Sequence, residues 1–411
     1  MFKLEMIFAF EGDCLLLHYG DSDQPEWILI DGGARTTWRD RLKPRLARMA
    51  QQLGEPVPLR MVMVSHVDSD HIKGVLDMYK LLKDDHAEQI CTVDVLWHNS
   101  FDDIIDNDDE ELVSALITPP DGEEIEDRDV AAVVEPASIN QGRNLRLDAE
   151  ALATEVNTPF TGLVRALDGP PVPIDQGFGL TFEVLAPGET RLQAFQKKWR
   201  DFLVDKQLAQ VRTASFDDTS PANLSSIVVL AKRNGKSMLL TGDARGDDIV
   251  NGLVGARLLR EDAAYPIRED FPAGRSGTRQ WKEKLRQADT VDPVSSFGVD
   301  LLKMPHHGSD RNVMTGFFRR VLADHYVISA DGNHGNPDVP TLRMIAEARG
   351  DAPYTLYFSF TADQHQHEDN QEFAEALEKV HDWVRDEKPA GCTVIHRASA
   401  NVASLSIDLD G

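Results

Sequence analysis

The most informative part of the sequence is Leu59-Arg60-Met61-Val62-Met63-Val64, which runs straight into Ser65-His66-Val67-Asp68-Ser69-Asp70-His71. The apolar part, 59–64, predicts a buried strand, because short continuous apolar runs that end in turn residues are typical of one. The polar part places two imidazoles and two carboxylates directly after that strand. Such ligands suit zinc, manganese or iron, and they are more than a single ion needs from one loop. The stretch therefore predicts a two-metal hydrolytic site at the end of a strand.

Two further strand ends carry residues of the same kind. The apolar run 237–240 passes into Thr241-Gly242-Asp243, and the run 299–304 passes into Pro305-His306-His307-Gly308-Ser309. Loops at one edge of a sheet can converge on one site while the strands hold them rigidly. We therefore expect the three loops to supply one metal centre. Which of His306 and His307 binds metal stays open at this point.

The His-x-Asp-x-Asp-His run resembles the metal-binding signature of the metallo-β-lactamase fold, whose usual form is His-x-His-x-Asp-His. Asp68 stands where the second histidine normally stands. This variant looks like the hydrolase domain of ComEC-type DNA-uptake proteins and their soluble relatives, and the similarity can be followed from residue 1 to about residue 410. The resemblance implies an α/β fold, an αββα sandwich, as one domain over 1–411. Helical or irregular insertions are expected at about 100–180 and 260–297.

The resemblance also implies a role for each ligand candidate. Asp243 matches a carboxylate that bridges two divalent ions, either zinc or manganese. Asp70 and His71, with His306 or His307, would hold one ion, and His66 with Asp68 would hold the other. The candidate catalytic residues are Asp70 and His334, and the additional candidates for the site are Asp31, His98, Asn223, Ser309 and Asn336.

The chain departs from the usual family pattern at two places. No histidine lies between His98 and His306, so either His98 replaces the missing ligand or one metal has fewer protein ligands. The segment around Asn223 resembles the Asn-x-Ser stretch of ComEC-type domains, which also lack that histidine. A nitrogen-poor site should weaken the preference for zinc and favour manganese or another hard ion.

The second departure follows the strand 326–329. Where the family has Gly-His-Pro, this chain has Gly335-Asn336-Pro337, with His334 two residues before Asn336. Two alternatives follow: His334 contacts the substrate from a shifted position, or it is an exposed turn histidine.

Composition limits the remaining choices. A formal net charge of -26 argues against non-specific binding of nucleic acid, which depends on phosphate neutralisation. The chain has no apolar run long enough to predict a membrane span and no signal-peptide pattern at its start. The three cysteines are far apart, which predicts buried thiols and a cytoplasmic location.

The expected function is hydrolysis by a metal-activated hydroxide. The resemblance favours a phosphodiester: nucleic acid, a nucleotide or a phosphorylated small molecule. A carboxylic ester or lactam substrate is one alternative, and a non-catalytic metal-binding scaffold or regulatory partner is another. The insertions would then offer a lid or a surface for a protein partner. The basic residues near the last ligand loop would either contact phosphates or form a solvated helix face: Lys303, Arg311, Arg319 and Arg320.

Overall fold

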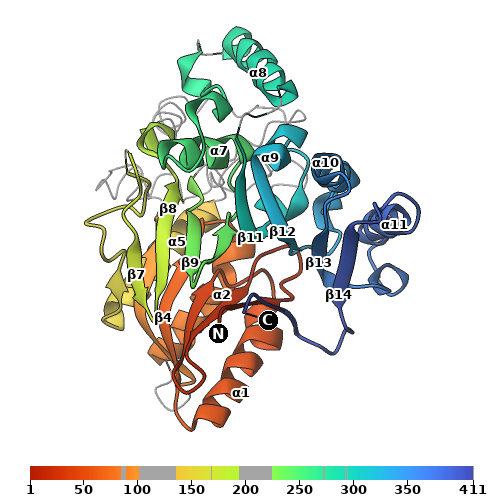
Figure 1. Cartoon of the computed structure of the whole chain (residues 1–411). Helices are drawn as coiled ribbons and strands as arrows, with labels where there is room; N and C mark the ends of the chain where they lie inside the picture. The colour runs from red at the N-terminus through yellow and green to blue at the C-terminus, as the bar shows by residue number, and fades with distance from the viewer. Residues whose placement is uncertain are drawn as a thin grey trace, which may run out of the picture.

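Two mixed β-sheets lie face to face with helices on both outer sides (Figure 1). The computed structural model describes residues 1–84, 89–100, 136–167, 169–193, 225–271, 274–291, 293 and 295–410. This layered α/β arrangement confirms the predicted sandwich. The sequence also has an acidic run at 102–127, which predicts a solvated loop or insertion, and a basic segment at 196–200 on a predicted helix; both lie outside the described residues.

The first sheet has the order β15-β1-β2-β3-β4-β5-β6. Its strands are β1 (Lys3–Ile7), β2 (Leu15–Gly20), β3 (Pro25–Ile30), β4 (Val57–Val64), β5 (Cys91–His98), β6 (Glu155–Val156) and β15 (Ser404–Asp408). The strands from β3 to β6 are parallel, and β15 returns from the far end of the chain to pair with β1. The predicted strand at 59–64 is therefore the inner strand β4, with parallel neighbours on both sides.

The second sheet has the order β14-β13-β12-β11-β10-β9-β8-β7. Its strands are β7 (Ile174–Gly177), β8 (Leu180–Ala186), β9 (Val228–Arg233), β10 (Lys236–Leu240), β11 (Phe297–Lys303), β12 (Val321–Ile328), β13 (Tyr354–Thr361) and β14 (Cys392–Arg397). An Asn-Gly pair between two apolar runs predicts a hairpin turn. Asn234 and Gly235, both with positive φ, form that turn between β9 and β10. Strands β10 and β11 are parallel neighbours, so the loops that carry Asp243 and His306 leave the same edge.

Three apolar layers hold the sandwich together. Between the sheets, Ile28 and Met61 of the first sheet pack in one cluster with Val229 and Leu301 of the second. The outer face of the first sheet is covered by α1 (Lys43–Leu53), α2 (Ser69–Asp84) and α5 (Pro136–Ala151). The outer face of the second is covered by α7 (Gly246–Gly255), α8 (Gly274–Thr290), α9 (Thr315–Arg320), α10 (Val339–Arg349) and α11 (Gln371–Asp386).

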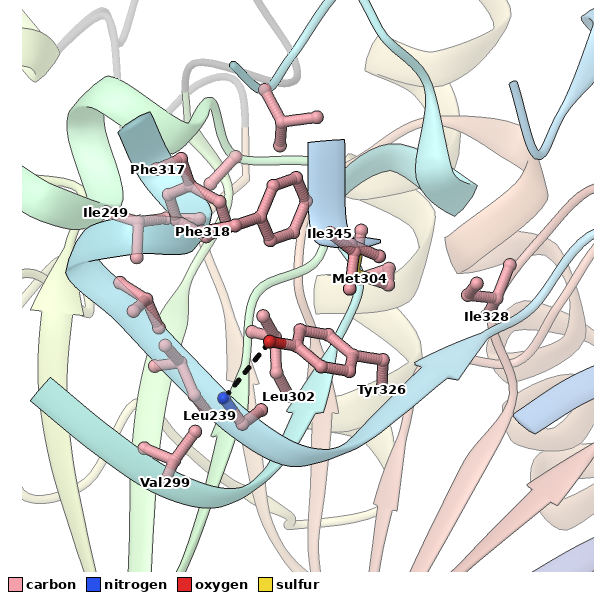
Figure 2. Close-up of a cluster of buried hydrophobic side chains, with 14 of the residues drawn as sticks. Leu239, Ile249, Val299, Leu302, Met304, Phe317, Phe318, Tyr326, Ile328 and Ile345 are labelled. Carbon is pink, nitrogen blue, oxygen red and sulfur yellow. Dashed lines mark hydrogen bonds between the residues drawn. The ribbon is translucent and has the colours of Figure 1, made fainter. Parts of the chain in front are cut away.

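Figure 2 shows part of this outer layer of the second sheet. Phe317 and Phe318 of α9 pack towards Tyr326 of β12 and Leu302 of β11. All four side chains are almost fully buried. Burying a side chain of this kind stabilises the fold by about 1.5–3 kcal/mol, so this layer fixes β11 and β12, which carry the histidine loop.

Two helices begin at other residues than the sequence predicts. The sequence predicts a helix that opens at Ile72, after the ligand loop, and runs through Leu82; helix α2 instead begins at Ser69, so Asp70 and His71 lie in its first turn. Apolar residues at helical spacing predict a helix over 38–53, with Pro44 as a mark of its true first turn. The structure has a short π-helical turn (Trp38–Leu42) followed by α1, with Pro44 in the first turn of α1. Helix α11 and strand β14 were not predicted.

Parts of the predicted insertions pack into the sandwich. Helix α5 lies against α2, β6 extends the first sheet and β7 extends the second. All three cysteines are free and buried, as expected. Across the described ranges, no helix combines the length and apolar character needed to cross a membrane.

Candidate metal centre

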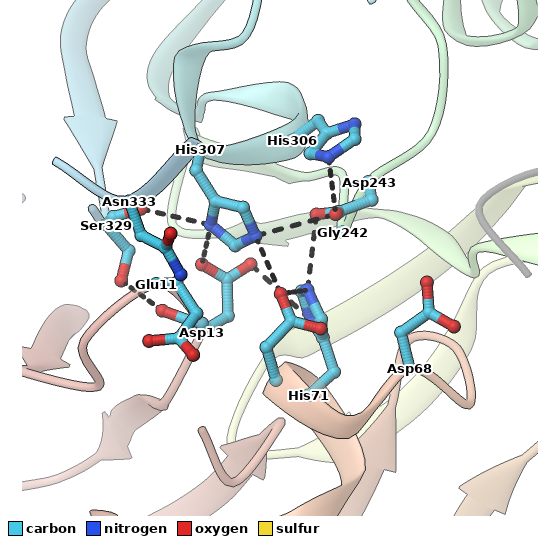
Figure 3. A network of polar contacts seen from close by, with 12 residues as sticks. Glu11, Asp13, Asp68, His71, Gly242, Asp243, His306, His307, Ser329 and Asn333 are labelled. Carbon is cyan, nitrogen blue, oxygen red and sulfur yellow. Dashed lines mark hydrogen bonds and ion pairs between the residues drawn. The ribbon is translucent and has the colours of Figure 1, made fainter. Parts of the chain in front are cut away.

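The three predicted loops meet at one point, at the edge where β4, β10 and β11 end (Figure 3). Four side chains each offer one ligand atom, and these atoms lie within 4.8 Å of one another: Asp70, His71, Asp243 and His307. His71 Nε2 lies 3.3 Å from Asp243 Oδ1, and His307 Nε2 lies 3.5 Å from Asp243 Oδ2. Asp70 Oδ2 lies 3.5 Å from His71 Nε2 and 3.3 Å from His307 Nε2.

A second set of candidate ligands lies beside the first and shares Asp243 with it. His66 Nε2 is 3.6 Å from Asp68 Oδ2 and 3.9 Å from Asp243 Oδ2. His306 Nε2 is 3.6 Å from the same Asp243 oxygen. Both histidines of the His-His pair thus have Nε2 within 3.6 Å of Asp243 Oδ2, and His307 Nε2 also lies 3.3 Å from Asp70 Oδ2.

The fit to a metal is shown by polar atoms that are buried without a hydrogen-bond partner. They include Nε2 of His66, His71 and His307 and Oδ1 of Asp243. Leaving one such atom unpaired costs about 1–3 kcal/mol, so several at one point indicate that something else satisfies them. Imidazole nitrogen and carboxylate oxygen are ligands that zinc and manganese accept. The cluster therefore has the donor set and burial of a divalent-metal site.

The far nitrogen of each imidazole is held by a neighbour. His71 Nδ1 donates to Asp31 Oδ2 at 2.8 Å, and His307 Nδ1 donates to the Ser329 carbonyl at 3.0 Å. His306 Nδ1 lies 2.9 Å from Asn312 Oδ1. A proton held on Nδ1 leaves the lone pair on Nε2, so these contacts direct the ligand nitrogens to the centre of the cluster.

Backbone geometry also serves the site. His306, His307 and Gly308 all have positive φ, at 45°, 56° and 85°. Such a conformation costs about 1–3 kcal/mol for a non-glycine residue and persists where the surroundings impose it. It turns consecutive histidine side chains onto the same carboxylate. Gly242, with φ of 50°, lies so close to Ser65 that an added Cβ would be 2.8 Å from the Ser65 Cβ.

The electrostatics keep the carboxylates ionised. Burial acts to raise the pKa of Asp243, but His307, His306 and His71 outweigh it and hold that pKa well below its usual range. Burial likewise opposes ionisation of Asp70, yet His71 and His307 lower its pKa. Both carboxylates are anionic at neutral pH and are available as metal ligands.

The additional candidates lie at different distances from the cluster. Asp31 is fully buried and accepts from the Ser65 amide and hydroxyl, both at 2.7 Å, as well as from His71. It therefore orients a ligand. Ser309 and Asn336 are buried in the loops near His307, and Asn223 lies outside the described residues.

Neither of the other two predicted histidines joins the cluster. His98 is buried against α5, where a Cβ added to Gly142 would lie 3.3 Å from its Nε2. Burial lowers the His98 pKa to about 3. His334 is exposed in the 3-10 turn Asn333–Gly335. Among the described residues, no hydrogen bond or ion pair connects the side chain of His98 or of His334 to the cluster.

The prediction for the basic residues was wrong for Lys303 and Arg320. Lys303 is 1% exposed and faces Asp13 and Gly242, and Arg320 is 2% exposed and bonds the carbonyls of Ala263 and Gly316. Both side chains are therefore too buried to form a solvated helix face. Lys303 is buried beside Asp13, and Arg320 is buried with its guanidinium over the Tyr265 ring, which the sequence pattern alone did not indicate.

Sequence reasoning missed Asp13 and Asn312, and it did not place Lys303 beside the ligands. Asp13 precedes β2, and its oxygens lie 3.5 Å from His307 Nδ1 and 3.8 Å from His71 Nδ1. Asn312 Oδ1 lies 2.9 Å from His306 Nδ1, and the Asn312 side-chain amide donates to the Asp243 backbone carbonyl at 3.2 Å. The one available signal was an acid directly before a buried apolar strand, in Glu11-Gly12-Asp13.

The chain matches no protein-family model and no curated protein sequence. Solved structures similar to it include YhfI from Bacillus subtilis, a metallo-beta-lactamase fold protein, at 10% identity over 99% of both chains and a TM-score of 0.30. Zn(2+)-bound PqqB from Methylobacterium extorquens is 10% identical over 100% of both chains, with a TM-score of 0.34. MEM-A1, a subclass B3 metallo-beta-lactamase from a soil metagenome library, is 14% identical over 94% of each chain, with a TM-score of 0.26. Similarity at TM-scores and identities this low supports no inference about the chemistry of this chain. That inference depends on the cluster itself.

Proposed function

We propose that this chain is a metal-dependent hydrolase of the metallo-β-lactamase type and that it cleaves a phosphodiester. The observation that carries the proposal is the convergence of buried, unpartnered Nε2 atoms of His66, His71 and His307 on Asp243. A bound divalent ion would supply Lewis acidity and lower the pKa of water at the site. The residues to hold it are the two sets that share Asp243.

The half-buried members of the cluster face the substrate in this proposal. The side chains of Asp68, Asp70 and His306 are 31%, 27% and 26% exposed, whereas the other ligands are almost fully buried. Asp70 is ionised and within reach of two histidines, so it can accept a proton at Oδ2. The buried ligands hold the geometry and exclude water from the rear of the site.

The phosphodiester part of the proposal is supported by the ComEC-type resemblance of the ligand motif. Of the two remaining basic residues, Arg319 pairs with Glu347 at 2.7 Å, and Arg311 is the one that we propose for a phosphate contact. Arg311 is exposed and lies two residues beyond Ser309, next to the His306–Gly308 turn. A cation at the rim of an acidic cluster is suited to orient an anionic substrate.

Hydrolysis of bis(p-nitrophenyl) phosphate with manganese and with zinc tests the proposal. Turnover should disappear in His71→Ala and Asp243→Ala, while His367→Ala, which removes an exposed histidine outside the cluster, should behave as the wild type. Arg311→Ala should raise KM more than it lowers kcat. Metal-loaded protein that cleaves only a carboxylic ester or lactam would overturn the substrate class, and no turnover of any of these would favour a non-catalytic scaffold.

A further inference from the structure

A buried ion pair lies behind the metal cluster and has no role in the function proposed so far. Lys303 is the last residue of β11, and Asp13 lies in the loop before β2, so the pair joins the two sheets. Both side chains are 1% exposed. Lys303 Nζ forms an ion pair with Asp13, donates to the Gly242 carbonyl at 3.0 Å and lies 3.8 Å from Asp243 Oδ1.

Asp13 in turn lies behind two of the imidazoles. Its Oδ1 is 3.5 Å from His307 Nδ1 and its Oδ2 is 3.8 Å from His71 Nδ1, on the side away from Asp243 (Figure 3). The loop has little room to move. A Cβ added to Gly12 would lie 1.9 Å from the Asp70 carbonyl oxygen, and the Gly12 carbonyl accepts from Ser329 Oγ at 2.6 Å.

The cluster crowds carboxylates that repel one another. Asp13, Asp31, Asp70 and Asp243 all lie within 4 Å of a nitrogen of His71. Like charges at this range disfavour the assembled state unless a cation offsets them. Lys303 is the cation already built into the chain, and it contacts both Asp13 and the loop that carries Asp243.

We propose that Lys303 and Asp13 are positioning residues that assemble the ligand set before a metal binds. Lys303 draws the Gly242–Asp243 loop and Asp13 together, and Asp13 supports the rear faces of His71 and His307. This inference rests on the proposed function only in taking the cluster to bind a divalent ion. It predicts that a metal finds its ligands in place and does not have to organise them.

A mutant cycle separates positioning from simple stabilisation. Asp13→Asn and Lys303→Met each leave a buried charge unpaired and should lower thermal stability, whereas the double variant removes both charges and should recover most of it. Metal affinity should not recover. In the double variant, the Kd for zinc, measured by competition with a chelator, should remain 10–100-fold higher than in the wild type.

The visible absorption spectrum with Co²⁺ gives a second readout, since it reports ligand geometry directly. We expect a changed spectrum in the double variant. A zinc Kd within about threefold of the wild type, with an unchanged Co²⁺ spectrum, would show that the pair only stabilises the fold. A wild-type protein that binds no zinc, manganese or cobalt would instead overturn the proposed metal site.

Hydrogen exchange on the wild type tests the same inference if the double variant does not fold. The His306 amide donates to the Gly242 carbonyl at 3.2 Å, the same oxygen that accepts from Lys303. A preassembled site predicts similar protection of this amide with chelator and with zinc. Protection that appears only after zinc is added would refute the inference.

Discussion

Replacing Asp31 by Asn should separate the ligand-orienting role of this residue from the shape of its side chain. Asp31 accepts three hydrogen bonds in a fully buried position, from the Ser65 amide, the Ser65 hydroxyl and His71 Nδ1, at 2.7, 2.7 and 2.8 Å. Asparagine has nearly the same volume but only one acceptor oxygen. If that oxygen still accepts the hydrogen bond from the Ser65 amide, the NH₂ group of the new asparagine faces His71.

The magnitude follows from these contacts. His71 can accept from the new amide only if its proton moves from Nδ1 to Nε2, and that proton then points at Asp243 Oδ1, 3.3 Å away. The nitrogen that would bind metal is thereby blocked. Loss of an outer partner of this kind typically weakens metal binding about 10–100-fold, and the lost charged hydrogen bond should lower the free energy of unfolding by about 1.5–3 kcal/mol.

Two measurements check the Asp31→Asn prediction: the zinc Kd by chelator competition, and the free energy of unfolding by urea titration of the metal-free protein. Asp94→Asn is the matched control, because it makes the same substitution at a carboxylate that is 55% exposed and forms a surface ion pair with Arg60. The control should change neither quantity. A zinc Kd for Asp31→Asn equal to that of the wild type would refute the argument that Asp31 sets the His71 proton.

Three further outcomes are expected. Gly74→Ala should lower the free energy of unfolding by about 1–3 kcal/mol or more, because its Cβ would lie 1.9 Å from the Gly32 carbonyl oxygen. The control Gly255→Ala, whose Cβ would meet open space, should not lower it. Equal midpoints of the two variants in a urea titration would contradict the prediction. Glu5→Gln should be less stable than the wild type at pH 7 by about 1.5–3 kcal/mol. Burial acts to raise the pKa of Glu5, but hydrogen bonds from His18 and Arg45 outweigh it and hold that pKa well below its usual value of 4.5. The extra stability of the wild type is therefore present above pH 4.5 and is lost as pH falls below it, so the free energies of unfolding of the two proteins should converge in acid. A difference that stays constant with pH would argue against this linkage. Zinc at about 100 times its Kd should stabilise the wild type by about 2.7 kcal/mol, a gain that EDTA reverses, and an unchanged melting temperature would speak against a metal site.

Several parts of the fold were predictable because they depend on local pattern. The apolar run before Ser65 predicted β4, the Asn234-Gly235 pair predicted the β9–β10 hairpin, and Pro44 predicted the first turn of α1. Helix α11 was missed although its apolar residues recur at helical spacing, and the start of α2 was placed too late. Helix boundaries depend on which backbone groups find partners after packing, which local pattern does not specify.

The ligand types and the strand ends that carry them were predictable from the sequence: His66, Asp70 and His71 after one strand, Asp243 after another, and the His306-His307 pair after a third. The distances between these groups were not predictable, because residues far apart in the chain are brought together by the pairing of β10 with β11 and the packing of the two sheets. The same packing buried Lys303 against Asp13 and left His334 exposed. From the sequence alone, a lysine beside a ligand loop is expected to lie at the surface. Its burial becomes evident only when the structure places a carboxylate from the opposite sheet next to it.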